Sequence, residues 1–204
     1  MIIGEDFVWI HFPKCAGTFT EQLLRKYYGA DPRMAFDPIA PGKNNWHDSV
    51  LKREKSAGID LSRKQVICNI RRLPYWIISR VKYEEARSGH RATREMYTGG
   101  MVFEQDGTPY KANRLVNFYT IRKVDHWIRV EYLAEDFYRC FGRYLDVVSR
   151  INESEFATKI NSTAGDARLD TWFGEGDLER LYASNSIWTK LEMELYGNLL
   201  TTSP

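Results

Sequence analysis

The pattern of apolar and polar residues predicts strands that alternate with helices along the chain. Two short apolar runs, Phe7–Ile10 and Gln65–Ile70, are rich in β-branched and aromatic residues, which is typical of strands buried on both faces. A third strand is expected at His126–Glu131. Apolar residues at helical spacing follow the strands, over residues 18–28, 75–87 and 133–148. This order predicts an α/β fold: a parallel sheet with helices on both faces and a ligand crevice at the carboxyl ends of the strands.

The segments between these elements carry weaker signals. Residues 30–46 are rich in Pro and Asn, and they predict a loop with at most one short strand around Met34–Phe36. A helix capped by Asp48 and ended by Gly58 should follow. Residues 88–112 hold several glycines and predict a long loop or a small hairpin. Further helices are expected over residues 113–123 and, as one or two closing helices, over 177–197.

The loop after the first strand has the features of an anion cradle. Thr18 is a candidate N-cap, and Glu21 three residues later completes a capping box. N–H groups at a helix N-terminus and the helix dipole attract negative charge, and Lys14 adds a point charge. We therefore expect a phosphate here. The loop is not a Walker A motif, because its lysine precedes Gly17, and it lacks the spaced glycines of a dinucleotide fingerprint.

Residues 11–18 read His-Phe-Pro-Lys-Cys-Ala-Gly-Thr. This stretch resembles the 5′-phosphosulfate loop of sulfotransferases that use 3′-phosphoadenosine-5′-phosphosulfate (PAPS), and it is closest to the carbohydrate (Golgi-type) sulfotransferases. Phe19 stands where that family usually has Ser or Thr, which leaves Thr20 as the candidate for the hydroxyl contact. The resemblance implies a P-loop-like three-layer fold with a central parallel sheet flanked by helices. It also implies that residues 1–204 form a single sulfotransferase-like domain.

A second motif follows the second strand. Residues 71–79 read Arg-Arg-Leu-Pro-Tyr-Trp-Ile-Ile-Ser, where sulfotransferases carry Arg-Asp/Asn-Pro-x-x-Arg-x-x-Ser. The resemblance implies that Arg71 and Ser79 hold the 3′-phosphate of the nucleotide. Leu73 and Trp76 depart from the family pattern, and this departure leaves Arg72 as an alternative to Arg71.

The resemblance extends to a polar loop and to a set of nucleotide-binding residues. Asn161 and Ser162 resemble a family loop that closes over the nucleotide, and Trp172 is a candidate to stack on adenine. The cofactor-binding residues implied are Pro13, Lys14, Cys15, Ala16, Gly17, Thr18, Phe19, Thr20, Arg71, Ser79, Asn161 and Ser162.

The implied reaction is the transfer of a sulfuryl group from PAPS to a hydroxyl or amine of a carbohydrate or small metabolite, with 3′,5′-bisphosphoadenosine as product and no metal. Such a reaction resembles phosphoryl transfer, in which positioning and charge stabilisation dominate. Lys14 would stabilise the leaving phosphate. His47 is the candidate base, since related enzymes carry a His at this place, and Glu21 is its rival. His11 and His126 are interpreted as structural, and His90 as a possible substrate contact.

Charge and composition limit the remaining function classes. Among 204 residues, 29 basic and 27 acidic side chains nearly balance, so binding to nucleic acid is not expected. Residues 61–95 carry nine Lys/Arg and three Glu, a net charge of +6, which fits an anionic ligand. Three cysteines predict neither a disulfide framework nor a zinc site. The sequence has no signal-like leader or membrane segment, so a cytoplasmic protein is expected.

Two other function classes remain open. A nucleotide-dependent kinase with an atypical P-loop would need acidic magnesium ligands, and none is evident at a strand end. A non-catalytic module that binds a nucleotide or a sulfated glycan would keep the arginines but has no need of Lys14. The sequence leaves open which acceptor is used and in which oligomeric state the protein works.

Overall fold

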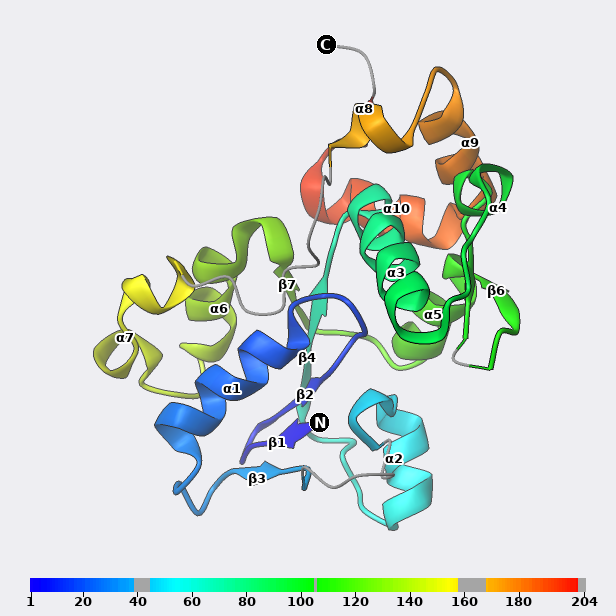
Figure 1. The fold of residues 1–204 in the computed structure, drawn as a ribbon. Helices are drawn as coiled ribbons and strands as arrows, with labels where there is room; N and C mark the ends of the chain where they lie inside the picture. The colour runs from blue at the N-terminus through cyan, green and yellow to red at the C-terminus, as the bar shows by residue number, and fades with distance from the viewer. Residues whose placement is uncertain (39–44, 105, 158–167, 202–204) are drawn as a thin grey trace. The chain divides into compact units, whose positions relative to one another are not determined.

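The computed structural model describes residues 1–38, 45–104, 106–157 and 168–201 (Figure 1). The chain packs as two compact units, and each is described by itself below. The first contains Met1–Ile70 and Tyr119–Ser162, and the second contains Arg71–Phe118 and Thr163–Pro204. The assignment of the whole chain to one sulfotransferase-like domain stays a prediction.

The first unit is built on a mixed, mostly parallel sheet. Within the described residues its five strands lie in the order β3-β1-β2-β4-β7. The three strands in the middle and at one edge are parallel: β2 (Phe7–Ile10), β4 (Gln65–Ile70) and β7 (His126–Arg129). At the other edge, β1 (Ile2–Ile3) pairs antiparallel with both β2 and the edge strand β3 (Ala35–Phe36). Ile10 lies beside Cys68, so β2 and β4 end at the same edge of the sheet.

Helices flank this sheet in the first unit. Figure 1 shows α1 (Gly17–Tyr28) and α6 (Leu133–Phe141) on one side of the sheet and α2 (Val50–Ala57) on the other. Side chains of α1 and α6 join the sheet in one apolar core, with Trp9, Leu24 and Phe137 wholly buried. Shorter helical segments complete the unit: η1 (Asn45–His47), η2 (Val130–Tyr132), α7 (Val147–Arg150) and η3 (Glu153–Ala157).

The second unit is mainly helical. On its long helix α3 (Leu73–Ser88), Trp76 packs on Trp188 of α10 (Ser186–Tyr196), with the two ring centroids 4.8 Å apart. A small antiparallel hairpin of β5 (Met101–Phe103) and β6 (Pro109–Lys111) follows the short helix α4 (Arg94–Thr98). The other helices are α5 (Ala112–Thr120), α8 (Leu169–Trp172), α9 (Asp177–Ser184) and α10 (Ser186–Tyr196).

Most of the predicted elements are present, and the differences have physical causes. The three parallel strands are confirmed, whereas β1 and α4 were not predicted. Of the alternatives left open, residues 88–112 contain the small hairpin, and the loop after α1 contains one short strand, β3. The long helix expected over 133–148 is wrong. Gly142 ends α6, and a turn separates it from α7. The apolar spacing continues across the break because Leu145 and Val147 pack into the same core.

Candidate anion-binding site

The loop between β2 and α1 contains two non-glycine residues in the left-handed conformation. Lys14 and Ala16 have φ angles of 63° and 57°. Left-handed residues beside right-handed ones form the concave nests of N–H groups that bind anions, and strained backbone conformations cluster at functional sites. The Lys14 side chain is partly exposed.

The start of α1 leaves donors directed out of the helix. The N-cap is Ala16, which cannot cap through its side chain, and the first intrahelical bond runs from Thr20 N to Ala16 O at 3.1 Å. The N–H groups of Gly17, Thr18 and Phe19 therefore have no intrahelical acceptor. The prediction of a Thr18 cap and a capping box is wrong, since the N-cap lies two residues earlier, at Ala16, and Glu21 bonds to Arg25.

His11 is packed directly under this helix start. A Cβ atom on residue 17 would lie 1.9 Å from His11 Cδ2 and 2.0 Å from Nε2, so only glycine fits against the ring. The ring is 5% exposed, and its Nδ1 has no hydrogen-bond partner among the described residues. Burial lowers the pKa of His11 well below its ordinary value, and the neighbouring His47 lowers it further, so His11 is neutral.

A buried polar chain holds α1 to the sheet beneath the loop. Trp9 Nε1 donates to Asn69 Oδ1 at 2.8 Å, and Asn69 Nδ2 donates to the Thr20 hydroxyl at 3.0 Å. The Thr20 hydroxyl in turn donates to Ala16 O at 3.2 Å, and the residue is wholly buried. The prediction that Thr20 offers its hydroxyl to a ligand is therefore corrected: the hydroxyl anchors the left-handed residue that shapes the loop.

His47 lies beside the loop, on the segment before α2. Its ring contacts His11 edge to face, with centroids 4.7 Å apart, and its Nδ1 lies 3.1 Å from the carbonyl oxygen of His11. Because a carbonyl can only accept, Nδ1 carries the proton, and Nε2 of the neutral ring is the basic nitrogen. Tyr119 donates to the carbonyl oxygen of His47 at 2.7 Å and packs on Phe12. The imidazole is exposed and can accept a proton.

Helix α2 fixes the segment that carries His47. Its N-cap is Ser49, whose hydroxyl accepts from Lys52 N, rather than the predicted Asp48. Arg53 forms a two-pronged ion pair with Asp37, at 2.5 and 2.7 Å, and also contacts Asp48. Burial is the largest single influence on the pKa of Asp37 and would raise it. The bonds from Arg53 act in the opposite direction, and the resulting pKa is lower than the ordinary value.

Glu21, the rival base, is held in an ion pair. Arg25 Nε and NH2 both donate to Glu21 Oε1, at 2.9 and 2.8 Å, and the Glu21 side chain is buried on α1. A paired and buried carboxylate is less suited than the exposed imidazole to take a proton from a substrate.

The remaining residues predicted to bind the nucleotide differ in burial. Cys15 is wholly buried, and Phe19 packs in the core against Phe156 at 5.5 Å. Pro13 and Thr18 are partly exposed. Asn161 and Ser162 lie outside the described residues, so their predicted role stays a prediction.

In the second unit, the two candidate arginines differ in their surroundings. Arg72 is buried and donates to Glu192 Oε1 at 3.2 Å and to Asn198 O and Oδ1 at 3.0 and 2.9 Å. Its guanidinium also lies over Tyr196, 4.2 Å from the ring centroid. Arg72 therefore has a structural role. Arg71 is partly exposed and follows directly on β4.

The two departures from the family pattern also have structural roles. Trp76 is buried in the core of the second unit, and the backbone N–H of Leu73 donates to Glu192 Oε2 at 2.7 Å. Burial raises the pKa of Glu192, and the bonds from Leu73, Tyr182 and Arg72 oppose this rise. Ser79 lies on α3, two turns beyond Arg71, and is 8% exposed.

Sequence reasoning missed how His11 and Gly17 fit together, since each residue alone is unremarkable and only the fold brings the ring under the glycine.

A comparison of the chain with models of protein families, with curated proteins and with solved structures found no significant match. Among the described helices, none is both long and apolar enough to cross a bilayer.

Proposed function

We propose that this protein is a PAPS-dependent sulfotransferase with a P-loop-like sheet and loop, acting on a hydroxyl or amine of a carbohydrate or small metabolite. The observation that carries the proposal is the loop at 11–16. It follows a buried parallel strand, bends through left-handed Lys14 and Ala16, and ends on a helix start whose first N–H groups have no intrahelical acceptor. Such a loop is suited to a phosphate or sulfate group.

The second nucleotide contact is assigned to Arg71 and Ser79. Because β2 and β4 are parallel neighbours, the segments that follow them leave the sheet at the same edge. Arg71 is the better candidate of the two arginines, since it is partly exposed whereas Arg72 is buried. An arginine offers a forked, permanently charged donor to a 3′-phosphate, which ATP lacks.

The proposed reaction breaks one bond at sulfur and forms another. The acceptor oxygen or nitrogen attacks the sulfur, and the bond from sulfur to the 5′-phosphate oxygen breaks, which releases 3′,5′-bisphosphoadenosine. Lys14 and the N–H groups at the start of α1 stabilise the charge that develops on the leaving phosphate. The acceptor's proton passes to Nε2 of His47, whose tautomer is set by the bond from Nδ1 to His11 O.

Ligand-dependent thermal unfolding tests the nucleotide site. We expect 3′,5′-bisphosphoadenosine, without magnesium, to raise the melting temperature more than AMP or ATP at equal concentration. Arg71→Ala should weaken binding of the bisphosphate by roughly ten- to a hundredfold, as expected for loss of an interaction of about 1.5–3 kcal/mol, and should spare AMP binding. Arg63→Ala is the matched control, because exposed Arg63 precedes β4 whereas Arg71 follows it.

Two outcomes would contradict the proposal. Equal stabilisation by AMP and the bisphosphate would remove the 3′-phosphate site, and preferential stabilisation by ATP with magnesium would favour a kinase. If the bisphosphate binds, Lys14→Ala should still bind it but lose about a hundredfold or more in turnover with labelled PAPS, because Lys14 acts on charge that develops during transfer.

A further inference from the structure

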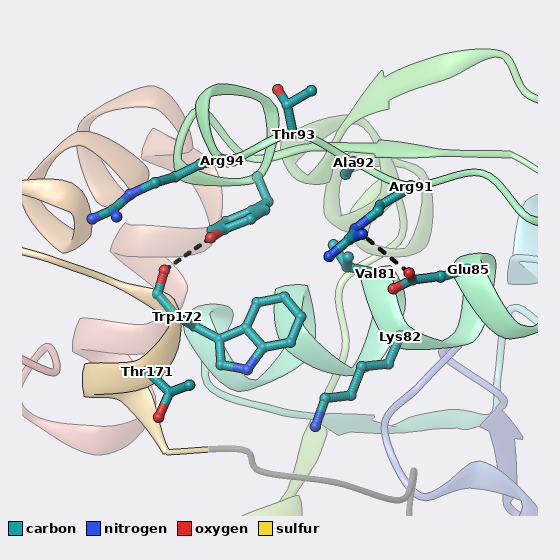
Figure 2. Close-up of a pocket in the computed structure, with 10 residues that line it drawn as sticks. Val81, Lys82, Glu85, Arg91, Ala92, Thr93, Arg94, Thr171 and Trp172 are labelled. Atoms are coloured by element: carbon teal, nitrogen blue, oxygen red, sulfur yellow. Dashed lines mark hydrogen bonds and ion pairs between the residues drawn. The ribbon is translucent and has the colours of Figure 1, made fainter.

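The second unit contains an open cavity of about 680 Å³ that the proposed nucleotide site does not use. Figure 2 shows its walls: the C-terminal half of α3 with Lys82 and Glu85, the segment leading into α4 with Arg91 and Arg94, and α8 with Trp172. All of these residues belong to the second unit. Three basic side chains and one acidic side chain give the lining a net charge of +2.

One wall of the cavity is aromatic. The Tyr97 and Trp172 rings lie 5.5 Å apart, and the Tyr97 hydroxyl donates to Trp172 O at 3.0 Å, which ties α4 to α8. Trp172 is half-buried, so part of its ring is accessible. Lys82 Nζ lies 5.6 Å from the centroid of this ring. Figure 2 shows the Lys82 side chain extending alongside Trp172. The flat apolar face of Trp172 and the ammonium group of Lys82 thus lie next to each other in the cavity.

The charged side chains around this wall are positioned by neighbours. Arg94 donates to Asp177 Oδ2 from Nε and NH2, at 3.0 and 2.6 Å, and Asp177 also accepts from Gly174 N at 2.9 Å. Arg91 lies 3.5 Å from Glu85, and both side chains are largely exposed. The cavity therefore offers cationic donors together with a carboxylate acceptor, and threonine hydroxyls at 93 and 171 extend its rim.

We propose that this cavity binds an acidic sugar unit of a saccharide acceptor, an inference that rests on the proposed sulfotransferase function. The face of a pyranose ring, which presents C–H groups, packs on Trp172. Its carboxylate or sulfate group binds Lys82 and Arg91. Glu85 accepts hydrogen bonds from sugar hydroxyls, whereas the same carboxylate would repel the closely spaced phosphates of a nucleic acid. The openness of the site, with the Arg91 side chain 80% exposed, suits a unit within a chain.

Direct binding titrations, followed by tryptophan fluorescence and by calorimetry, test this proposal. The probes are a hyaluronan hexasaccharide for carboxylate groups, a chondroitin sulfate hexasaccharide for sulfate groups, and neutral maltohexaose. We expect the acidic probes to bind at least tenfold more tightly than maltohexaose. The stronger of the two acidic probes identifies which acidic group the site prefers.

Variants locate the binding in the cavity. Trp172→Ala and Lys82→Ala should each weaken binding of the acidic probes by about tenfold, and Trp172→Phe should restore most of it. Lys190→Ala is the control, since exposed Lys190 lies on α10 of the same unit and does not line the cavity. Unchanged melting temperatures without ligand show that the variants are folded.

Three results would overturn the inference: equal binding of maltohexaose, tighter binding of oligouridylate than of the acidic sugars, or binding that Trp172→Ala and Lys82→Ala leave unchanged. Stabilisation by 3′,5′-bisphosphoadenosine is measured on the same samples. If the acidic saccharides bind but the bisphosphate stabilises the protein no more than AMP does, the sulfotransferase proposal is contradicted and the saccharide site is retained. If the bisphosphate is preferred but the saccharides do not bind, only the saccharide site is contradicted.

Discussion

At the scale of single residues, conformation and contact distinguish side chains that the sequence presents as equivalent. Arg71 and Arg72 are neighbours of the same type, yet Arg72 is bound to Glu192 and Asn198 while Arg71 is partly exposed. His47 and Glu21 are both candidate bases, yet the imidazole is exposed and the carboxylate is paired with an arginine. Burial and pairing therefore assign roles that residue type leaves open.

The choice of base predicts a pH dependence of turnover. If His47 Nε2 takes the acceptor's proton, kcat should fall on the acid side of neutral pH, because a protonated imidazole cannot accept. His47→Ala should remove this acid limb and lower kcat by about a hundredfold or more while leaving nucleotide binding unchanged. Glu21→Gln is the comparison. A variant pair in which Glu21→Gln abolishes turnover and His47→Ala does not would reverse the assignment.

At the scale of elements, the strand–loop–helix unit of residues 7–28 combines local signals with contacts that only the fold creates. The apolar run and the helical spacing are local, and both elements formed where they were expected. The helix start was misjudged because a threonine near a helix N-terminus usually caps it. Here the left-handed Ala16 begins the helix instead, and it is held by Thr20 from one turn later.

The contact between His11 and Gly17 predicts an energetic coupling at this helix start. Gly17→Ala should destabilise the protein by about 1–3 kcal/mol, as overpacking does, because the new Cβ would meet the His11 ring. In a His11→Ala background the same substitution should cost much less, since the ring is gone. Chemical denaturation of the four proteins of this double-mutant cycle measures the coupling. Equal costs in both backgrounds would show that the ring does not limit residue 17.

At the scale of the whole molecule, net charge gives no overall preference for binding anions. The near balance of 29 basic and 27 acidic side chains gives no large overall field, so local arrangement decides where anions bind.

The stability of the folded chain should depend on pH through His11. Burial lowers the pKa of His11, so the unfolded chain binds a proton near pH 6.5 that the folded chain does not. The free energy of unfolding should therefore fall as the pH drops below about 6.5, by at most about 1.4 kcal/mol per pH unit, until the pKa of the folded state is reached. Chemical denaturation at pH 7.5 and 5.5 measures this loss.

A variant tests whether His11 is responsible for this loss. His11→Gln should shrink the loss of stability between pH 7.5 and 5.5. Some loss will remain, because burial also lowers the pKa of His126. An undiminished pH dependence in His11→Gln would show that His11 is not the group responsible.

The α/β class, the three parallel strands and the position of the loop between β2 and α1 could be predicted from the amino-acid pattern alone. These features are local: apolar runs of strand length, helical spacing, and a lysine and glycine placed between them set the elements without reference to distant residues. The closing helices were predicted for the same reason. The glycines of residues 88–112 left a long loop or a small hairpin open, and the structure has the hairpin.

Which polar side chains are buried against partners could not be predicted from the sequence, because it depends on packing between distant segments. Thr20 is hydrogen-bonded to Asn69, 49 residues away, and Arg72 to Glu192, 120 residues away. Nothing in the sequence near Thr20 or Arg72 indicates these partners. The cavity at Trp172 likewise joins α3, α4 and α8, which are separated along the chain. A buried polar group must find a partner, and the partner is supplied by packing between distant segments, which spacing along a sequence does not encode.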